Sequence, residues 1–142
     1  MIVTAFDPIH GRGSELLRFN TDPRSSGACD LSPDGTRIAA ITGPDDPIQV
    51  FSLGGQHAQM IVAKGLSQKG QLSWAADGKG LLVTHQSQSG SELVYVDLRG
   101  NTKAVWKNNA GMHPWGIQSP DGKYLAIQNS VYNGNMWLME NF

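Results

Sequence analysis

A short motif recurs at a nearly constant interval along this chain. Asp-Gly pairs occupy residues 34–35, 77–78 and 121–122, which are 43 and 44 residues apart. So constant a period is typical of repeat proteins, in which each repeat forms one supersecondary unit. The period therefore limits the folds that the chain can adopt more than any single residue does.

Each repeat contains the same series of short apolar runs. A half-apolar segment precedes each Asp-Gly pair, and a β-rich run follows it: "RIAAIT", "GLLVTH" and "YLAIQN". A polar loop and a third run come next, and the first two repeats add a fourth run, "AQMIVA" or "KAVWK". Runs of about five or six residues are typical of strands and too short for helices.

We predict that each Asp-Gly pair closes a hairpin between the first two strands of a repeat. Aspartate tolerates tight turns, and glycine adopts positive φ without a steric penalty. Gly35, Gly78 and Gly122 should have positive φ, in a type I′ turn or in a three-residue turn with a bulge. The aspartates are then structural, not catalytic. The second strands should be buried, and their expected core residues are Ile38, Ile41, Leu81, Val83, Leu125 and Ile127.

Four short strands in every ~40 to 45 residues describe the blade of a β-propeller. The predicted fold class is all-β, with blades of four antiparallel strands and about three blades in the chain. Residues 1–20 would form two strands of an incomplete blade. Residues 21–65 and 66–107 would form one blade each, and residues 108–142 a three-stranded last blade.

About three blades do not close a ring, because propellers typically contain four to eight. The chain either belongs to a longer propeller or forms a six-bladed ring as a homodimer. In the homodimer, the run "ELLRF" would complete the last blade of the partner chain, while "IVTAF" has no assigned place. The strands expected to close the ring contain Glu15, Leu16, Leu17 and Phe19, and Met136, Trp137 and Leu138.

The repeat "SPDGK" followed by three apolar residues resembles the repeat of TolB-like propellers. Together with "FDPIHGRGSELLRF", "LVYVDLRGN" and "NMWLMENF", it also resembles the C-terminal propeller of bacterial membrane-linked serine/threonine kinases and related regulators. That resemblance implies a sensory or protein-interaction module, placed outside the cytoplasm. The chain contains none of the kinase motifs, so the resemblance carries over no catalytic residue.

Composition argues against several partners. The net charge is -1 and no basic run is present, so no nucleic-acid partner is expected. No apolar stretch approaches the ~20 residues of a membrane helix, so no direct insertion is expected. The four histidines lack the spacing of a zinc motif, and we predict neither a metal nor a cofactor. Cys29, the single cysteine, is expected to be a small buried residue.

The predicted topology directs two sets of loops to one face of the propeller. These loops join strand two to strand three, and strand four to the next blade. Binding residues often lie on such loops of a rigid scaffold. The predicted function is a non-enzymatic module that binds a protein, peptide or small molecule. The alternative is a hydrolase, or a hydrolase accessory, with its site in the central channel. The candidate binding residues are Asp45, Asp46, Lys69, His113, Trp115, Tyr132 and Asn133.

Overall fold

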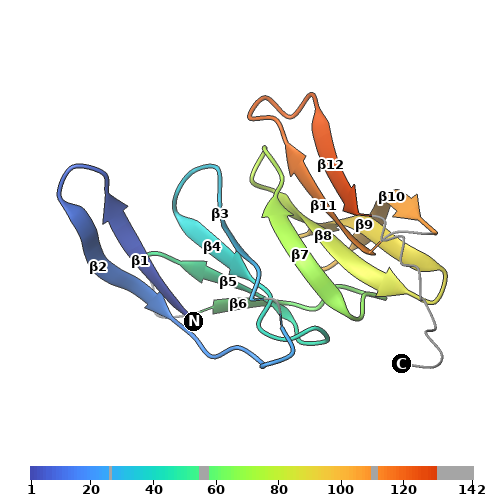
Figure 1. Cartoon of the computed structure of the whole chain (residues 1–142), viewed down its shortest axis with the longest axis horizontal. Coiled ribbons are helices and arrows are strands. Elements are labelled where there is room, and N and C mark those ends of the chain that lie inside the picture. The colour runs from blue at the N-terminus through green and yellow to red at the C-terminus, as the bar shows by residue number, and fades with distance from the viewer. Residues whose placement is uncertain (26, 55–57, 110–111, 131–142) are drawn as a thin grey trace, which may run out of the picture.

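The computed structural model of the chain describes residues 1–25, 27–54, 58–109 and 112–130. These residues form twelve strands and contain no helix. The strands make four antiparallel sheets, which follow one another along the chain as an open arc (Figure 1). The predicted all-β fold class is therefore confirmed. The thirteenth predicted strand, which contains Met136, Trp137 and Leu138, lies outside the described residues.

Two of the sheets are complete four-stranded blades. Blade one consists of β3 (Cys29–Leu31), β4 (Arg37–Ala40), β5 (Ile48–Ser52) and β6 (Ala58–Ile61). Blade two consists of β7 (Lys69–Trp74), β8 (Gly80–Ser87), β9 (Gly90–Asp97) and β10 (Thr102–Asn108). In both blades each strand pairs with the next one in the chain, as in the blades of a propeller.

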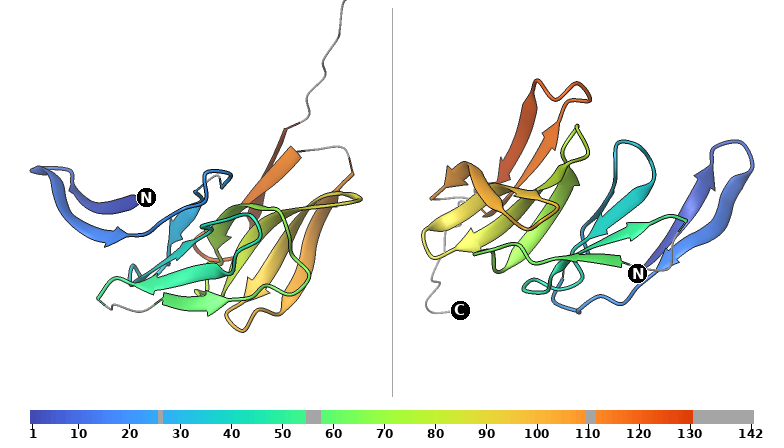
Figure 2. Two further views of the ribbon diagram at one scale, coloured as in Figure 1. Left: turned by 90° about the horizontal axis from the view of Figure 1, so that it is seen from below. Right: turned by 180° about the vertical axis from the view of Figure 1, so that it is seen from behind.

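A two-stranded sheet stands at each end of the arc (Figure 2). The first contains β1 (Ile2–Asp7) and β2 (Gly11–Arg18), and the last contains β11 (Met112–Gln118) and β12 (Leu125–Ser130). The run "IVTAF", which had no assigned place, is β1 and pairs antiparallel with β2. Next to β2, the ring of Phe19 stacks on Phe51 of blade one with 5.1 Å between the ring centroids.

The repeated Asp-Gly pair forms the predicted hairpin turn in all three repeats. In the first repeat the Asp34 carboxylate accepts hydrogen bonds from the Ser32 hydroxyl at 2.5 Å and from the Thr36 amide at 3.0 Å. These bonds lower the pKa of Asp34 to about 2. The aspartate therefore holds its own turn together, as expected for a structural residue. The turn that contains Asp121 repeats this pattern.

The predicted positive φ is confirmed at Gly35, Gly78 and Gly122, with values of 70°, 65° and 70°. Pro33 and Asp34 do not have positive φ, which excludes a type I′ turn. We expect Gly35→Ala to destabilise the fold by about 1–2 kcal/mol, because a Cβ is disfavoured in this conformation. A Cβ added at Gly35 would meet no other atom within 4 Å, so the expected cost comes from the backbone conformation alone. Gly54→Ala is the control, since Gly54 lacks positive φ and also faces open space. Chemical denaturation of both variants checks the expectation, and equal effects would contradict it.

The core lies between blades one and two and is built largely from their second and third strands. Of the predicted residues, Ile38, Ile41, Leu81 and Val83 are buried, none of them more than 4% exposed. All of these except Ile38 belong to one continuous apolar cluster, and neighbouring strands contribute the rest of it. The members of this cluster are Ala39, Ile41, Ile48, Val50, Ile61, Ala63, Leu72, Trp74, Leu81, Val83, Val94 and Val96.

Three predicted core residues are less buried than expected. Leu125 and Ile127 of β12 are only half-buried, although Leu125 faces blade two and lines a pocket with Leu82 and Tyr95. Cys29 is exposed rather than buried, since it lies on the side of β3 that faces away from blade two. The prediction of uniformly buried second strands is therefore wrong for the last sheet.

The first strands of successive sheets are joined by polar contacts near the middle of the arc. Trp74 of β7 donates from its backbone nitrogen and its indole nitrogen to Asp30 of β3, at 2.8 and 3.1 Å. The Ser73 hydroxyl donates to the Gly116 carbonyl of β11 at 2.5 Å. The strands β3, β7 and β11 therefore follow one another as the inner strands of a propeller do.

Candidate functional site

The two predicted sets of loops meet at one end of the sheets, and we call this end the loop face. The loop that enters blade two approaches the loop between β4 and β5, since the Lys69 amide donates to the Pro44 carbonyl at 2.8 Å. The loop that enters blade one approaches the end of β4, since the Asp22 amide donates to the Thr42 carbonyl at 2.6 Å. Successive loops thus form one continuous surface.

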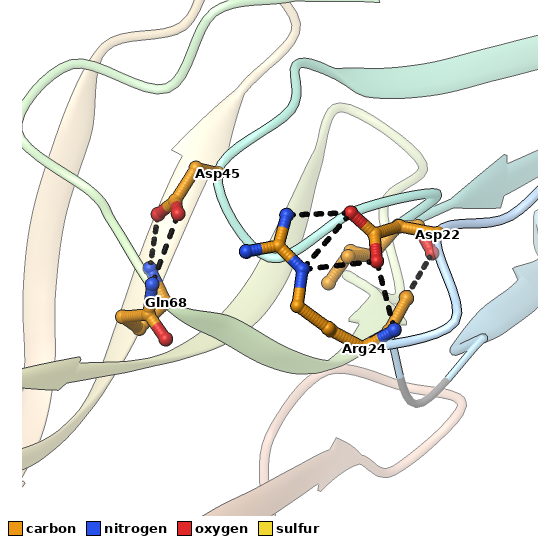
Figure 3. Close-up of polar contacts among 6 residues, drawn as sticks. Asp22, Arg24, Asp45 and Gln68 are labelled. Carbon is orange, nitrogen blue, oxygen red and sulfur yellow. Dashed lines mark hydrogen bonds and ion pairs between the residues drawn. The ribbon is translucent and has the colours of Figure 1, made fainter.

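At the loop face, the carboxylate of one residue joins two loops through hydrogen bonds. Asp45 accepts hydrogen bonds from the backbone nitrogen of Gln68 at 2.8 Å and from its side-chain amide at 2.9 Å, as Figure 3 shows. Gln68 has a φ of 49° and is the only described residue other than glycine with positive φ. Such strained backbone persists only where the surroundings hold it, and it is frequent at binding sites.

A charged pair, Asp22 and Arg24, lies beside this contact (Figure 3). The Arg24 guanidinium donates to both carboxylate oxygens of Asp22, the shortest distance being 2.7 Å. This contact and the bond from the Arg24 amide lower the pKa of Asp22 to about 2. The charges of Asp45 and Asp46 also raise the pKa of Arg24. Acidic and basic groups from two loops therefore act on one another here.

Four ionisable residues lie opposite one another across blade two, near its loop-face end. Lys69 of β7 pairs with His85 of β8, and His85 pairs with Glu92 of β9. Glu92 in turn pairs with Lys107 of β10. Directly opposed residues of antiparallel strands point to the same side of the sheet. We call these four residues the polar row.

The outer half of the polar row is an ion pair. The Lys107 ammonium lies 3.0 Å from one carboxylate oxygen of Glu92, and its hydrogen bond lowers the pKa of Glu92. The other carboxylate oxygen lies 3.6 Å from Nε2 of His85. The Glu92 carboxylate thus contacts both of its neighbours in the polar row, Lys107 and His85.

The inner half of the polar row is buried. Lys69 is 5% exposed and His85 is 6% exposed. Nε2 of His85 faces Glu92, whereas Nδ1 has no hydrogen-bond partner within the described ranges. Burial lowers the pKa of Lys69, and the charges of Asp45 and Asp46 partly oppose this effect. Buried polar groups normally have partners, so Nδ1 of His85 requires an explanation.

Three of the predicted binding residues come together at the loop face: Asp45, Asp46 and Lys69. Trp115 lies on the inner strand β11 and is 41% exposed. His113 also lies on β11. Tyr132 and Asn133 lie outside the described residues.

No binding role was predicted for Gln68, His85, Glu92 or Lys107. The strand alternation contains a signal for two of them. In β8, His85 lies on the same side of the sheet as the buried residues Leu81 and Val83. In β9, Glu92 lies on the same side as the buried residues Val94 and Val96. A polar residue at the end of a buried apolar alternation is unusual and indicates a special position.

A pocket of about 400 Å³ lies at the opposite end of the inner strands. Trp74 and Ile117 line it, together with residues of the three turns such as Pro33 and Pro120. The aspartates of these turns bond to their own turns, as described above for Asp34 and Asp121. This end of the channel is therefore bordered mainly by structural turns.

Neither a metal site nor a membrane span was found in the part of the chain that the structure describes. No group of three or more metal-ligating side chains is present within residues 1–25, 27–54, 58–109 and 112–130. The same ranges contain no helix long and apolar enough to cross a membrane.

Comparison with known proteins identifies the fold but no family. No protein-family model and no curated protein matches the chain. Among solved structures, the crystal structure of TolB from Acinetobacter baumannii is similar, with a TM-score of 0.64 and 20% sequence identity. The match covers 90% of this chain and 31% of that one.

Two provisionally assigned 6-phosphogluconolactonases are also similar. The protein from Bacteroides fragilis has a TM-score of 0.51 at 23% identity, and the match covers 77% of this chain and 33% of that one. The protein from Bacteroides uniformis has a TM-score of 0.56 at 20% identity, with 89% and 40% covered. The chain thus spans well under half of each of these proteins. Such low identity shows the fold alone, and the chain has a β-propeller fold in the form of an open arc.

Proposed function

We propose that this chain is a non-catalytic β-propeller module that binds a protein, peptide or small molecule at its loop face. The contact between Asp45 and Gln68 carries this proposal. It fixes two loops to each other and holds Gln68 in a conformation that is costly for a residue with a side chain. A surface that is held in shape in this way is suited to binding, because less ordering is needed when a ligand arrives.

The resemblance of the sequence to the propellers of membrane-linked kinases supports a finer proposal. In that setting the chain would be the sensory or protein-interaction part of a signalling protein. The similarity to TolB supports the propeller fold on which this proposal depends.

We also propose that two copies of the chain close one six-bladed ring. Within the described residues each copy has two complete blades and two two-stranded sheets, β1–β2 and β11–β12. In the ring, the first sheet of one copy would complete the last blade of the other copy. Exchange of identical elements is a known route to dimers.

Exposed apolar residues of blade one and of the last sheet support this arrangement. Leu31 of β3 is 51% exposed on the side of blade one that faces away from blade two. Ile117 of β11 is 46% exposed on the far side of the last sheet, as is Trp115. In the ring these two faces would cover each other, which removes apolar surface from water.

Selection of peptides from a random phage library tests the binding function. We expect the selected peptides to bind Asp45→Ala much more weakly than the unchanged chain. Asp77→Ala is the matched control, because Asp77 lies in a turn at the opposite end of blade two. Equal binding to both variants, or no enrichment of peptides at all, would contradict binding at the loop face.

A hydrolytic function is the second candidate, and the two provisionally assigned lactonases favour it. An assay with 6-phosphogluconolactone separates the two functions. We expect the lactone to open at its spontaneous rate in the presence of the chain. A rate that rises in proportion to the protein concentration would contradict a purely binding function.

A further inference from the structure

The inner half of the polar row has a buried polar atom that a ligand could satisfy. Lys69 and His85 are both more than nine-tenths buried and directly opposite each other on neighbouring strands. Nδ1 of His85 is the one buried side-chain nitrogen or oxygen without a hydrogen-bond partner within the described ranges. A buried, unpaired polar group carries a substantial cost in free energy.

A bulge in β7 brings these two groups together. The register of β7 against β8 shifts between Lys69 and Leu72. A bulge inserts one residue and redirects the side chains beyond it. Because of this shift Lys69 lies opposite His85, beside the loop that carries Asp45 and Asp46. Bulges are frequent next to binding and active sites.

Charge selects the kind of group that would fit here. Lys69 can only donate hydrogen bonds, and a protonated histidine donates from both ring nitrogens. With Nε2 directed to Glu92, Nδ1 of His85 can donate to a ligand. One oxygen of a carboxylate could then accept from Lys69 and the other from His85. Glu92, Asp45 and Asp46 lie around these groups and disfavour an anion of higher charge.

We propose that Lys69 and His85 bind a carboxylate group of the ligand that occupies the loop face. This inference rests on the proposed binding function and names the chemistry of its ligand. Hydrogen bonds between charged partners are about twice as strong as neutral ones, and burial strengthens them further. The carboxylate would belong either to a small organic acid or to the C-terminus of a peptide.

Nuclear magnetic resonance of the full chain with ¹⁵N-labelled histidine rings tests the proposal. Sodium acetate should shift the Nδ1 signal of His85 in a saturable manner, with a dissociation constant on the order of millimolar. Acetamide has the same shape without the charge and should leave the signal unchanged. N-acetyl-alanyl-alanine distinguishes the two sources, because tighter binding than acetate indicates a peptide C-terminus and equal binding a small organic acid.

Two variants separate ligand binding from a structural effect. His85→Gln keeps a nitrogen near the position of Nε2 and lacks Nδ1, and its spectrum identifies the His85 signal. Lys69→Met keeps the buried stem of the side chain and removes its charge. We expect Lys69→Met to weaken acetate binding by about tenfold to 100-fold, the change typical of losing a charge-assisted hydrogen bond. Lys103→Met, on the exposed surface of β10, should have no effect.

Several results would overturn the proposal. An unresponsive His85 signal, equal shifts with acetamide, or tighter binding of inorganic phosphate would each exclude a carboxylate site at Lys69 and His85. Unchanged acetate affinity in Lys69→Met would do the same. If the peptides selected from the phage library still bind through Asp45, only this inference fails. If these peptides also fail to bind, the proposed function fails with it.

Discussion

Replacing Ile41 with alanine should lower the free energy of unfolding by about 2–5 kcal/mol. Ile41 is 1% exposed and belongs to the apolar cluster between blades one and two. The substitution removes buried methyl and methylene groups and leaves a cavity that strands on both sides can only partly fill. Denaturation by urea, followed by circular dichroism, measures the change.

Ile9→Ala is the matched control for this experiment. Ile9 lies in the turn between β1 and β2 and is 83% exposed. Truncating an exposed side chain usually changes stability by less than about 0.5 kcal/mol. If the two variants lost similar stability, the packing of blade one against blade two would be wrong. A loss below about 1 kcal/mol for Ile41→Ala would also contradict it.

The hairpins and the central core could be predicted because their causes are local in sequence. An Asp-Gly pair specifies its own turn through the carboxylate of the aspartate and the positive φ of the glycine, as at Asp34 and Gly35. A short apolar run after such a turn must be a strand that packs on both sides, as the adjacent buried residues Leu81 and Leu82 show. Neither conclusion requires knowledge of distant parts of the chain.

Burial at the ends of the arc could not be predicted from the same pattern. The runs that contain Leu125 and Ile127 resemble those of the other repeats, but burial also depends on a neighbouring sheet. Leu125 and Ile127 have such a neighbour on one side only, and both are half-buried. Cys29 is also exposed, on the side of β3 that faces away from blade two.

The polar row was missed because a bulge interrupts the alternation in β7. Strict alternation backward from Leu72 would not place Lys69 opposite His85, whereas the shifted register does. A bulge of one residue leaves no clear mark in a sequence that already contains many glycines. The special positions of His85 and Glu92 could have been recognised from the sequence, because each follows a run of alternating apolar residues, in β8 and in β9.

Replacing Ile117 with aspartate should weaken the proposed dimer by at least about 100-fold, because the ring would bury an unpaired charge. In a single chain Ile117 is 46% exposed, so the variant should still fold. Val62→Asp is the control, since Val62 is 67% exposed and lies just beyond the outermost strand of blade one. Sedimentation equilibrium over a range of concentrations measures both affinities. Equal dimer affinity in the two variants would show that Ile117 is not at the contact.

Deleting residues 1–18 tests the strand exchange separately. This deletion removes β1 and β2 and leaves Phe19, which packs on Phe51. We expect the shortened chain to be monomeric and to keep the circular dichroism spectrum of a β protein. A shortened chain that still dimerises would exclude the exchange of β1 and β2 between copies.

Static light scattering of the unchanged chain at micromolar concentration tests the closed ring most directly. Two copies with about three blades each would make six blades, and the scattering mass should be twice the 15.3 kDa of one chain. The exposed apolar residues Leu31 and Ile117 would then be covered. A stable, monodisperse species of 15.3 kDa would contradict closure by a second copy.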